Sequence, residues 1–223
     1  MDVGSIVSQV VFVGMGAAMF SLFYYAASRR ERDIHLQWRD FAARRGLSYE
    51  AATGNLFTRT TPTMQGLVGG VRVAIDSYVV RGVESAMSFT RVRSTAAGPL
   101  PVSVKVERST LLGSLGALVG MQDLVLGDPI FDERCVVRES DERLGRTLLD
   151  APLRDALQRW IVTAPQRAAF SYDHGALSVE WQGIELGHDA LDAAVAVVVA
   201  AQGAHDRPRG APSNQRGGGR VDP

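Results

Sequence analysis

The sequence predicts an α+β protein, with an N-terminal transmembrane helix followed by a mainly antiparallel sheet domain that has helices at its ends. Three observations lead to this fold class. Residues 3–28 carry no formal charge. Several segments between residues 71 and 181 alternate apolar with polar side chains, which is the period of a half-buried strand. The turns between these segments are short, which favours antiparallel pairing, and helical patterns gather near the ends of the chain.

Length and composition favour one domain. The chain has 223 residues, equal numbers of basic and acidic side chains, and a single cysteine, Cys135. After the apolar segment at the start and a polar tail at the end, residues 47–203 remain, which is enough to bury a core without disulfides. A net charge of zero argues against a broad electrostatic interface with nucleic acid. A lone cysteine suits a reducing compartment.

Residues 1–28 are predicted to form a transmembrane anchor. An α-helix needs about 20 apolar residues to cross a hydrocarbon layer of roughly 30 Å, and the uncharged run exceeds this length. Tyr24 and Tyr25 lie near its end, where aromatic rings favour the headgroup boundary. Asp2 is the only charged side chain that precedes the run. A cleaved signal peptide would have a basic start and a shorter apolar stretch, so an uncleaved signal anchor in the lipid bilayer is favoured.

The distribution of arginines predicts the orientation of this anchor. Arg29, Arg30 and Arg32 follow the run immediately, and no basic residue precedes it. The positive-inside rule then places the N-terminus outside and the domain in the cytoplasm. A periplasm-facing domain is the alternative. Small residues four positions apart could also let two such helices form a homodimer; they are Gly4 with Ser8, and Gly14 with Ala18.

Residues 29–46 are predicted to form a juxtamembrane amphipathic helix. Ile34, Trp38 and Phe41 recur at helical spacing, and Gly46 suits the C-terminal cap. Two interpretations remain open for the aromatic stripe. It could rest on anionic lipid, or it could pack on the domain, and the acids on the polar face favour packing.

The rest of the chain gives strands first and helices later. Alternating valines and other apolar residues predict strands over 71–75, 87–89 and 102–106, and shorter strands over 123–126 and 134–138. Helices are predicted after Ser140 and after Asp150 as N-caps. Residues 170–172 and 177–181 predict a hairpin around Asp173-His174-Gly175. A buried helix over 189–202 follows, and residues 204–223 are predicted to be a disordered tail.

Motifs for catalysis or cofactor binding are weak. The four histidines, His35, His174, His188 and His205, are not at metal-ligand spacing. The glycines at 113, 116 and 120 lack the order of a phosphate-binding loop, and there is no Gly-x-Ser-x-Gly motif. Cys135 lies among valines and is interpreted as a structural thiol. The sequence therefore predicts no cofactor and no metal.

One segment has the look of a motif: Gly127-Asp128-Pro129-Ile130-Phe131-Asp132, leading into Cys135-Val136-Val137. A strand with acidic and basic residues precedes it, and a helix containing Leu148-Leu149 and Leu153-Arg154-Asp155-Ala156-Leu157 follows. This arrangement resembles a Gly-Asp-x-x-Phe-Asp segment of uncharacterised bacterial membrane-associated proteins. The resemblance covers about residues 100–200 and implies no known activity, with Cys135 standing where an aromatic residue is usual.

Two functions compete for this segment. Asp128 and Asp132 could bond to nearby backbone N–H groups, which gives Gly127, Asp128, Phe131 and Asp132 a structural role. Alternatively, the two carboxylates could hold a cation or act as acid and base in a membrane-bound, metal-assisted hydrolase. The structural role is favoured. The sequence therefore predicts a membrane-tethered cytoplasmic domain that is a non-enzymatic binding or scaffold module with a protein partner.

Overall fold

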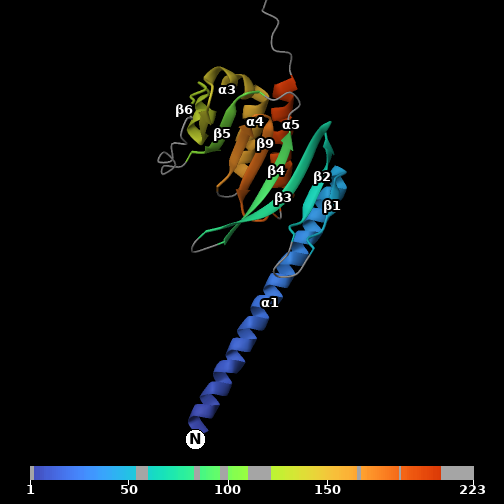
Figure 1. Cartoon of the computed structure of the whole chain (residues 1–223), viewed down its shortest axis with the longest axis vertical. Helices are drawn as coiled ribbons and strands as arrows, with labels where there is room; N and C mark the ends of the chain where they lie inside the picture. Colours follow the sequence, from blue (N-terminus) through green and yellow to red (C-terminus); the bar gives the residue numbers. More distant parts are fainter. Residues whose placement is uncertain are drawn as a thin grey trace, which may run out of the picture.

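The computed structural model describes residues 3–53, 60–82, 86–95, 100–109, 122–164, 167–185 and 187–206. The predicted tail beyond residue 206 and the glycine-rich connector at 113–120 lie outside the described residues. The chain begins with one long helix, α1 (Val3–Arg45), and continues into a sheet with helices packed on it. Figure 1 shows that α1 extends away from the sheet and that only its last turns lie beside it.

The C-terminal part of α1 is anchored in the core of the sheet domain. Trp38 and Phe41 are fully buried, and Ala42 beside them is buried too. The Trp38 indole Nε1 donates a hydrogen bond to the Glu185 carbonyl at 2.8 Å, and Arg45 pairs with Asp192 at 2.7 Å. The aromatic stripe therefore packs on the domain, as the acids on its polar face suggested.

The predicted transmembrane anchor is wrong. Among the residues that the structure describes, no helix is long and apolar enough to cross a membrane. The prediction rested on a run without formal charge over residues 1–28, and this criterion is weaker than apolarity, because glycine, serine, glutamine and tyrosine are uncharged without being strongly apolar. Three predictions that depended on this anchor are therefore wrong as well. They are the single-pass topology, the signal anchor, and the placement of the N-terminus outside and the domain in the cytoplasm.

The described strands form a single antiparallel sheet of nine strands. In sheet order they are β1 (Ser48–Glu50), β2 (Thr63–Val68), β3 (Val71–Arg81), β4 (Ala86–Thr95), β9 (Ala176–Gln182), β8 (Ala169–Asp173), β5 (Ser103–Arg108), β7 (Cys135–Glu139) and β6 (Gln122–Asp123). The long strand β4 pairs with β9, which lies far along the chain, so the last hairpin is inserted into the middle of the sheet. Because the predicted fold class required a transmembrane helix before this domain, it is wrong as stated.

Two hairpins have turns that the sequence dictates. Gly69 and Gly70 join β2 to β3 with positive φ angles of 58° and 83°, which glycine adopts without a steric penalty. His174 and Gly175 join β8 to β9 in the same way, with φ angles of 47° and 98°. The predicted hairpin around Asp173-His174-Gly175 is confirmed.

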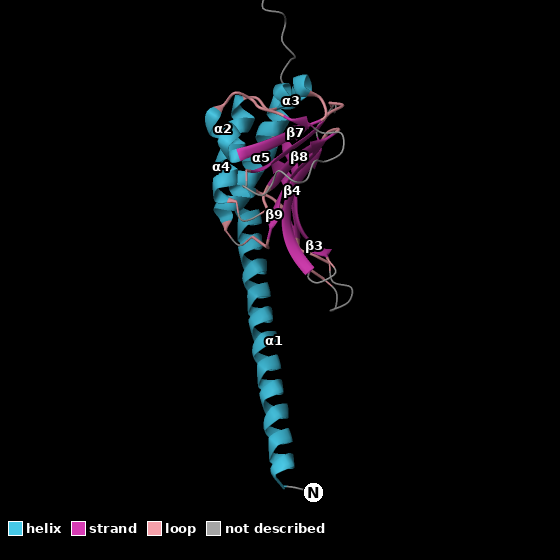
Figure 2. Cartoon of the chain, turned by 90° about the vertical axis from the view of Figure 1, so that its left-hand side faces the viewer, coloured by secondary structure: helices cyan, strands magenta, loops and turns pink. Residues whose placement is uncertain are grey.

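The remaining helices cover one face of the sheet, as Figure 2 shows. They are α2 (Pro129–Arg134), α3 (Glu142–Leu148), α4 (Ala151–Thr163) and α5 (His188–Asp206). Asp150 caps α4 as predicted, because its side chain accepts the Leu153 N–H. The cap of α3 is Asp141 and not Ser140, and α2 was not predicted as a helix at all.

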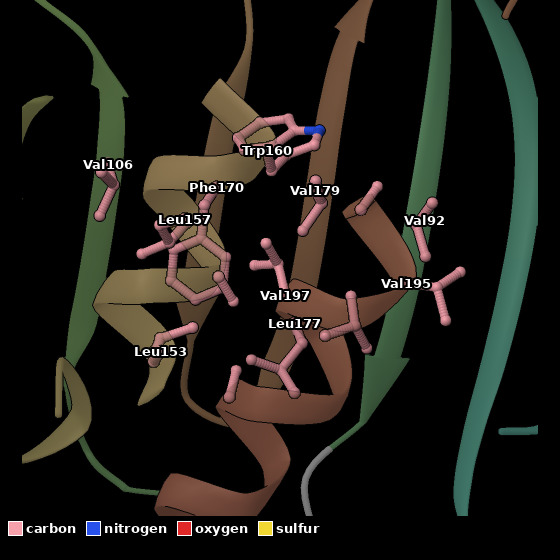
Figure 3. Packing of buried hydrophobic residues seen from close by; sticks show 14 of the residues in the cluster. Val92, Val106, Leu153, Leu157, Trp160, Phe170, Leu177, Val179, Val195 and Val197 are labelled. Atoms are coloured by element: carbon pink, nitrogen blue, oxygen red, sulfur yellow. The ribbon is translucent and has the colours of Figure 1, made fainter. Parts of the chain in front are cut away.

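The core lies between these helices and the covered face of the sheet. Figure 3 shows Leu153, Leu157 and Trp160 of α4 and Val195 and Val197 of α5 among the buried residues packed beside the strands. All three tryptophans of the chain are fully buried, and the rings of Trp160 and Trp181 meet edge to face at 6.3 Å between centroids. Aromatic burial of this size contributes much of the stability of a domain.

The opposite face of the sheet is polar. Asp76 of β3 is only 7% exposed, and its two carboxylate oxygens bind Arg91 at 3.0 and 3.1 Å and Arg93 at 2.9 Å. Farther along the sheet, Glu107 pairs with Lys105 and with Arg138, each at 2.8 Å. These ion pairs, one within β5 and the others between neighbouring strands, stabilise the uncovered face.

Candidate functional site

The Gly127–Asp132 segment forms the entry to helix α2. Gly127 has a φ of +79°, a conformation that favours glycine. Asp128 is the N-cap, and its Oδ1 accepts the Phe131 N–H at 3.2 Å. Asp132 bonds backward, with Oδ1 accepting the Leu126 N–H at 3.1 Å and Oδ2 accepting the Gly127 N–H at 2.9 Å.

The two carboxylates therefore serve the backbone around them. Both oxygens of Asp132 are used, and the second oxygen of Asp128 faces Arg154 Nε at 3.6 Å. Phe131 between them is fully buried. Within the described ranges, no group of three or more histidine, cysteine or acidic side chains is placed to hold a metal ion. This geometry indicates a structural role for the segment: its side chains cap the start of α2 and position Phe131 in the core.

Asp132 offers a direct test of this task. Asp132→Asn leaves one acceptor oxygen for two N–H groups, and we expect a loss of roughly 1 kcal/mol in the free energy of unfolding; Asp132→Ala leaves both unsatisfied and should cost about 2–3 kcal/mol. Urea denaturation with and without calcium or magnesium measures both. A cation-dependent rise in stability that disappears in Asp132→Asn would instead support the metal-assisted hydrolase.

The described histidines each contact different partners. His35 Nδ1 contacts the Tyr49 hydroxyl at 2.9 Å, and His188 Nε2 lies 3.2 Å from the Gln37 carbonyl. His174 sits in the hairpin turn beside Asp173. The side chain of His205 lies outside the described residues. The three described histidines thus form local contacts and no shared site.

Cys135 is unsuited to nucleophilic chemistry. It is 4% exposed, at the start of β7. Burial raises the pKa of its thiol to about 12, so the reactive thiolate is scarce at neutral pH. The interpretation as a structural thiol agrees with this environment.

The residues proposed for a membrane interface lie on α1 before it reaches the domain. Tyr24 and Tyr25 are exposed, as are Arg29, Arg30 and Arg32. Arg32 Nε reaches back to the Ser28 carbonyl at 3.4 Å. This segment is continuous with the helix that packs on the sheet, so the predicted boundary at residue 28 is not marked by a break in the helix.

A buried acid, Glu139, was missed by sequence reasoning. It lies in β7 on the face that the helices cover and is only 3% exposed. A backbone N–H of Asp141 bonds to its carboxylate, but Oε2 has no hydrogen-bond partner. Burial, followed by the charges of Asp141 and Glu142, raises the pKa of Glu139 above its ordinary value.

The raised pKa of Glu139 predicts a pH-dependent stability. A carboxyl with a raised pKa in the folded state favours folding while it is protonated, and this contribution is lost as the pH rises through that pKa. Glu139→Gln should therefore raise the melting temperature at pH 7 by about 2–4 °C, or roughly 1 kcal/mol. The difference should vanish once the pH falls well below the ordinary value of 4.5. Thermal melts across this pH range measure it, and a difference independent of pH would contradict the assignment.

An open groove of about 1000 Å³ lies beside β3. One wall is the end of β3, from Ser77 to Arg81, and the other comes from the segments on either side of the undescribed residues 54–59. The second wall carries Glu50 and four threonines, namely Thr53, Thr60, Thr61 and Thr63. Sequence reasoning missed this groove, although Pro62 directly before β2 was a signal that strand pairing ends there.

Tyr78 lines the groove and contacts three neighbouring side chains on the uncovered face of the sheet. Its hydroxyl donates to Glu180 Oε2 at 2.7 Å, and its ring stacks on Phe89 with 5.4 Å between centroids. The Arg91 guanidinium lies 4.9 Å from the ring centroid. Burial and the Glu180 bond raise the pKa of Tyr78 to about 12. Tyr78 is thus neutral at any physiological pH and fixed by three neighbours.

Comparison with known proteins identifies the fold. No protein-family model matches the chain, and no curated protein matches it. Among solved structures, the chain is similar to the crystal structure of the mycobacterial trehalose monomycolate transport factor A, TtfA, with 14% sequence identity and a TM-score of 0.53. The match covers 78% of this chain and 96% of that chain. At this identity the likeness establishes a shared fold, so the sheet and its helices follow the architecture of TtfA.

Proposed function

We propose that this chain is a non-enzymatic binding module that holds a protein partner in a transport process. The observation that carries the proposal is the open groove beside β3, where a strand of the sheet lacks a neighbour among the described residues. Unpaired strand edges are common sites of protein association. The resemblance to TtfA, a transport factor, supports the transport context.

The chemistry of the remaining candidates favours binding over catalysis. Asp128 and Asp132 are bonded to backbone N–H groups, which leaves little of either carboxylate to act on a substrate. The thiol of Cys135 is buried and protonated. A general acid or base must lie within hydrogen-bond reach of a bound substrate. Neither Asp128 nor Asp132 is among the described residues that line the groove.

A photocrosslinking experiment tests this function. A benzoylphenylalanine replaces Val79, which is 51% exposed in the groove, and in a matched variant it replaces Val125, which is 67% exposed next to β6 at the far end of the sheet. After irradiation of living cells, we expect one discrete protein adduct from position 79 that position 125 does not give. Mass spectrometry should identify that adduct as a component of a transport system.

Two results would contradict the proposal. The first is the absence of any adduct from position 79 at an expression level that gives full-length folded chain. The second is the same set of adducts from both positions, because that pattern reports random collisions and not a site.

A further inference from the structure

The groove beside β3 contains an open sheet edge. β2 begins at Thr63, which pairs with Asp76, so within the described part of the chain the residues from Ser77 to Arg81 have β4 on one side and no strand on the other. β3 therefore extends five residues past its neighbour. A strand edge of this length offers a row of backbone donors and acceptors to another chain.

The register shows which backbone groups face the open side. Residues in an antiparallel pair direct their N–H and C=O groups alternately to one neighbour and to the other. Val68 and Val71 flank the two-residue turn and form a hydrogen-bonded pair, so the odd-numbered residues of β3 face the β2 side. The backbone groups of Val79 and Arg81 consequently point into the groove. Pro62, opposite Ser77, has no N–H to donate to the Ser77 carbonyl.

The wall opposite β3 is held away from this edge. The Thr60 N–H donates to the Thr53 carbonyl at 2.8 Å, and the Thr53 N–H donates to Thr60 Oγ1 at 2.8 Å. Thr63 Oγ1 faces Glu50 Oε2 at 3.4 Å. These bonds tie the segments before and after residues 54–59 to each other instead of to β3. The result is a channel lined on one side by hydroxyl groups and on the other by a strand edge.

The end of the groove at Arg81 favours an acidic residue of a ligand. The described lining of the groove carries one base, Arg81, and one acid, Glu50. Asp76 binds Arg91 and Arg93, whereas Arg81 is exposed at the end of the groove and pairs with no described acid. A carboxylate of a ligand placed beside Arg81 would complement this charge.

The groove suits a peptide better than a saccharide. Sugars usually stack on an aromatic face, and the ring of Tyr78 is already in contact with Phe89 and with the Arg91 guanidinium. Its hydroxyl is bonded to Glu180. What remains available is the backbone of β3, together with the exposed valines Val79 and Val80. An extended peptide has donors and acceptors at the spacing of such an edge.

We propose that the edge of β3 from Ser77 to Arg81 binds an extended peptide segment of the partner, with an acidic residue beside Arg81, as an additional strand of the sheet. This inference rests on the proposed binding function and names its ligand class. Backbone hydrogen bonds to Val79 and Arg81 hold the peptide, and an acidic residue beside Arg81 sets its position. The threonines on the opposite wall contact its outer edge.

A displayed library of random eight-residue peptides, selected on the full chain, tests the proposal. Enriched sequences should alternate β-branched with other residues and carry an acid at a fixed position. Their synthetic forms should lose binding when alternate backbone nitrogens are methylated, because methylation removes the N–H groups of one edge.

Variants of the chain give the matched controls. Val79→Pro removes an N–H that faces the open side, so the sheet should stay folded while peptide affinity falls about tenfold or more; Val79→Ala keeps the N–H and should retain most of it. Arg81→Glu should shift the selected peptides from acidic to basic residues. Circular dichroism and melting curves check that each variant is folded.

Each other result overturns the inference. Peptides that bind Val79→Pro as well as the wild type, or a selection without enrichment, would exclude strand addition at this edge. A crosslink from position 79 to a second copy of this chain would make the edge a self-association surface instead. If the crosslink to a transport protein persists while no peptide is enriched, only the strand geometry fails. If the crosslink is absent as well, the proposed function fails.

Discussion

Replacing Phe131 with alanine should lower the free energy of unfolding by about 3–5 kcal/mol. The Phe131 side chain is fully buried, and it is the buried residue of the six-residue helix α2. Its removal would leave a cavity that a short helix fixed at both ends cannot close. Asp128 and Asp132 would then hold the backbone of a helix without its main apolar contact.

Urea denaturation measures this loss, with the neighbouring residue as the control. Ile130 lies in the same helix and is 57% exposed, so Ile130→Ala should change the free energy of unfolding by less than about 0.5 kcal/mol. Similar losses for the two variants would show that α2 matters through its helical backbone and not through the buried ring.

Replacing Trp38 with alanine should cost a similar amount, about 3–5 kcal/mol. The indole is fully buried between α1 and the sheet domain, and its Nε1 donates to the Glu185 carbonyl at 2.8 Å. The variant loses both the packing and this hydrogen bond. We expect the last turns of α1 to separate from the domain more readily, because the indole is the largest side chain that holds them there; Phe41, Ala42, the exposed Arg45–Asp192 pair and the contacts of His35 and His188 remain.

Two further variants separate the contributions at this position. Trp38→Phe keeps most of the apolar volume and removes the hydrogen bond to the Glu185 carbonyl, so it should cost about 1–2 kcal/mol. Leu36, two residues earlier, is 60% exposed, and Leu36→Ala should be nearly neutral. Hydrogen exchange of residues 34–45 should accelerate in Trp38→Ala alone. Unchanged exchange would mean that the helix is held by other contacts.

The sequence pattern was sufficient to predict those elements whose structure depends on residues close together in the chain. The hairpin of β8 and β9 follows from alternation on both sides of a turn that needs positive φ at two positions, and the cap of α4 follows from Asp150 before a proline. Trp38 and Phe41 were expected to pack on the domain because they share one helix face and the polar face of the same helix also holds acids.

Non-local features could not be predicted in this way. The pairing of β4 with β9 joins segments far apart in sequence, and nothing in either strand names its partner. Helix α2 has six residues and a single buried side chain, which is too short to show a helical period. Glu139 occupies an inward position of β7, where the alternation rule expects an apolar residue, so the rule fails at the position where the acid is buried.

The candidate functional residues also include some that the local sequence predicts and some that it does not. The role of Asp128 could be anticipated from its place between Gly127 and Pro129, and that of Asp132 from the tendency of aspartate to bond nearby backbone N–H groups. The groove beside β3 could not, because it arises from a mismatch in length between two paired strands, β2 and β3. The predicted anchor was wrong because its starting point was a run without formal charge, which is a weaker criterion than apolarity.

Because α1 is one continuous helix, it sets the distance between its first turns and the sheet domain. A helix of 43 residues that rises 1.5 Å per residue is about 65 Å long, which exceeds the diameter of a small domain. Its last turns are locked into the core through Trp38, so the sheet cannot swing about a joint at residue 28 as it would on a loose tether. Whatever holds the first turns of this helix also determines how far away, and in which rotational setting, the groove of β3 is presented.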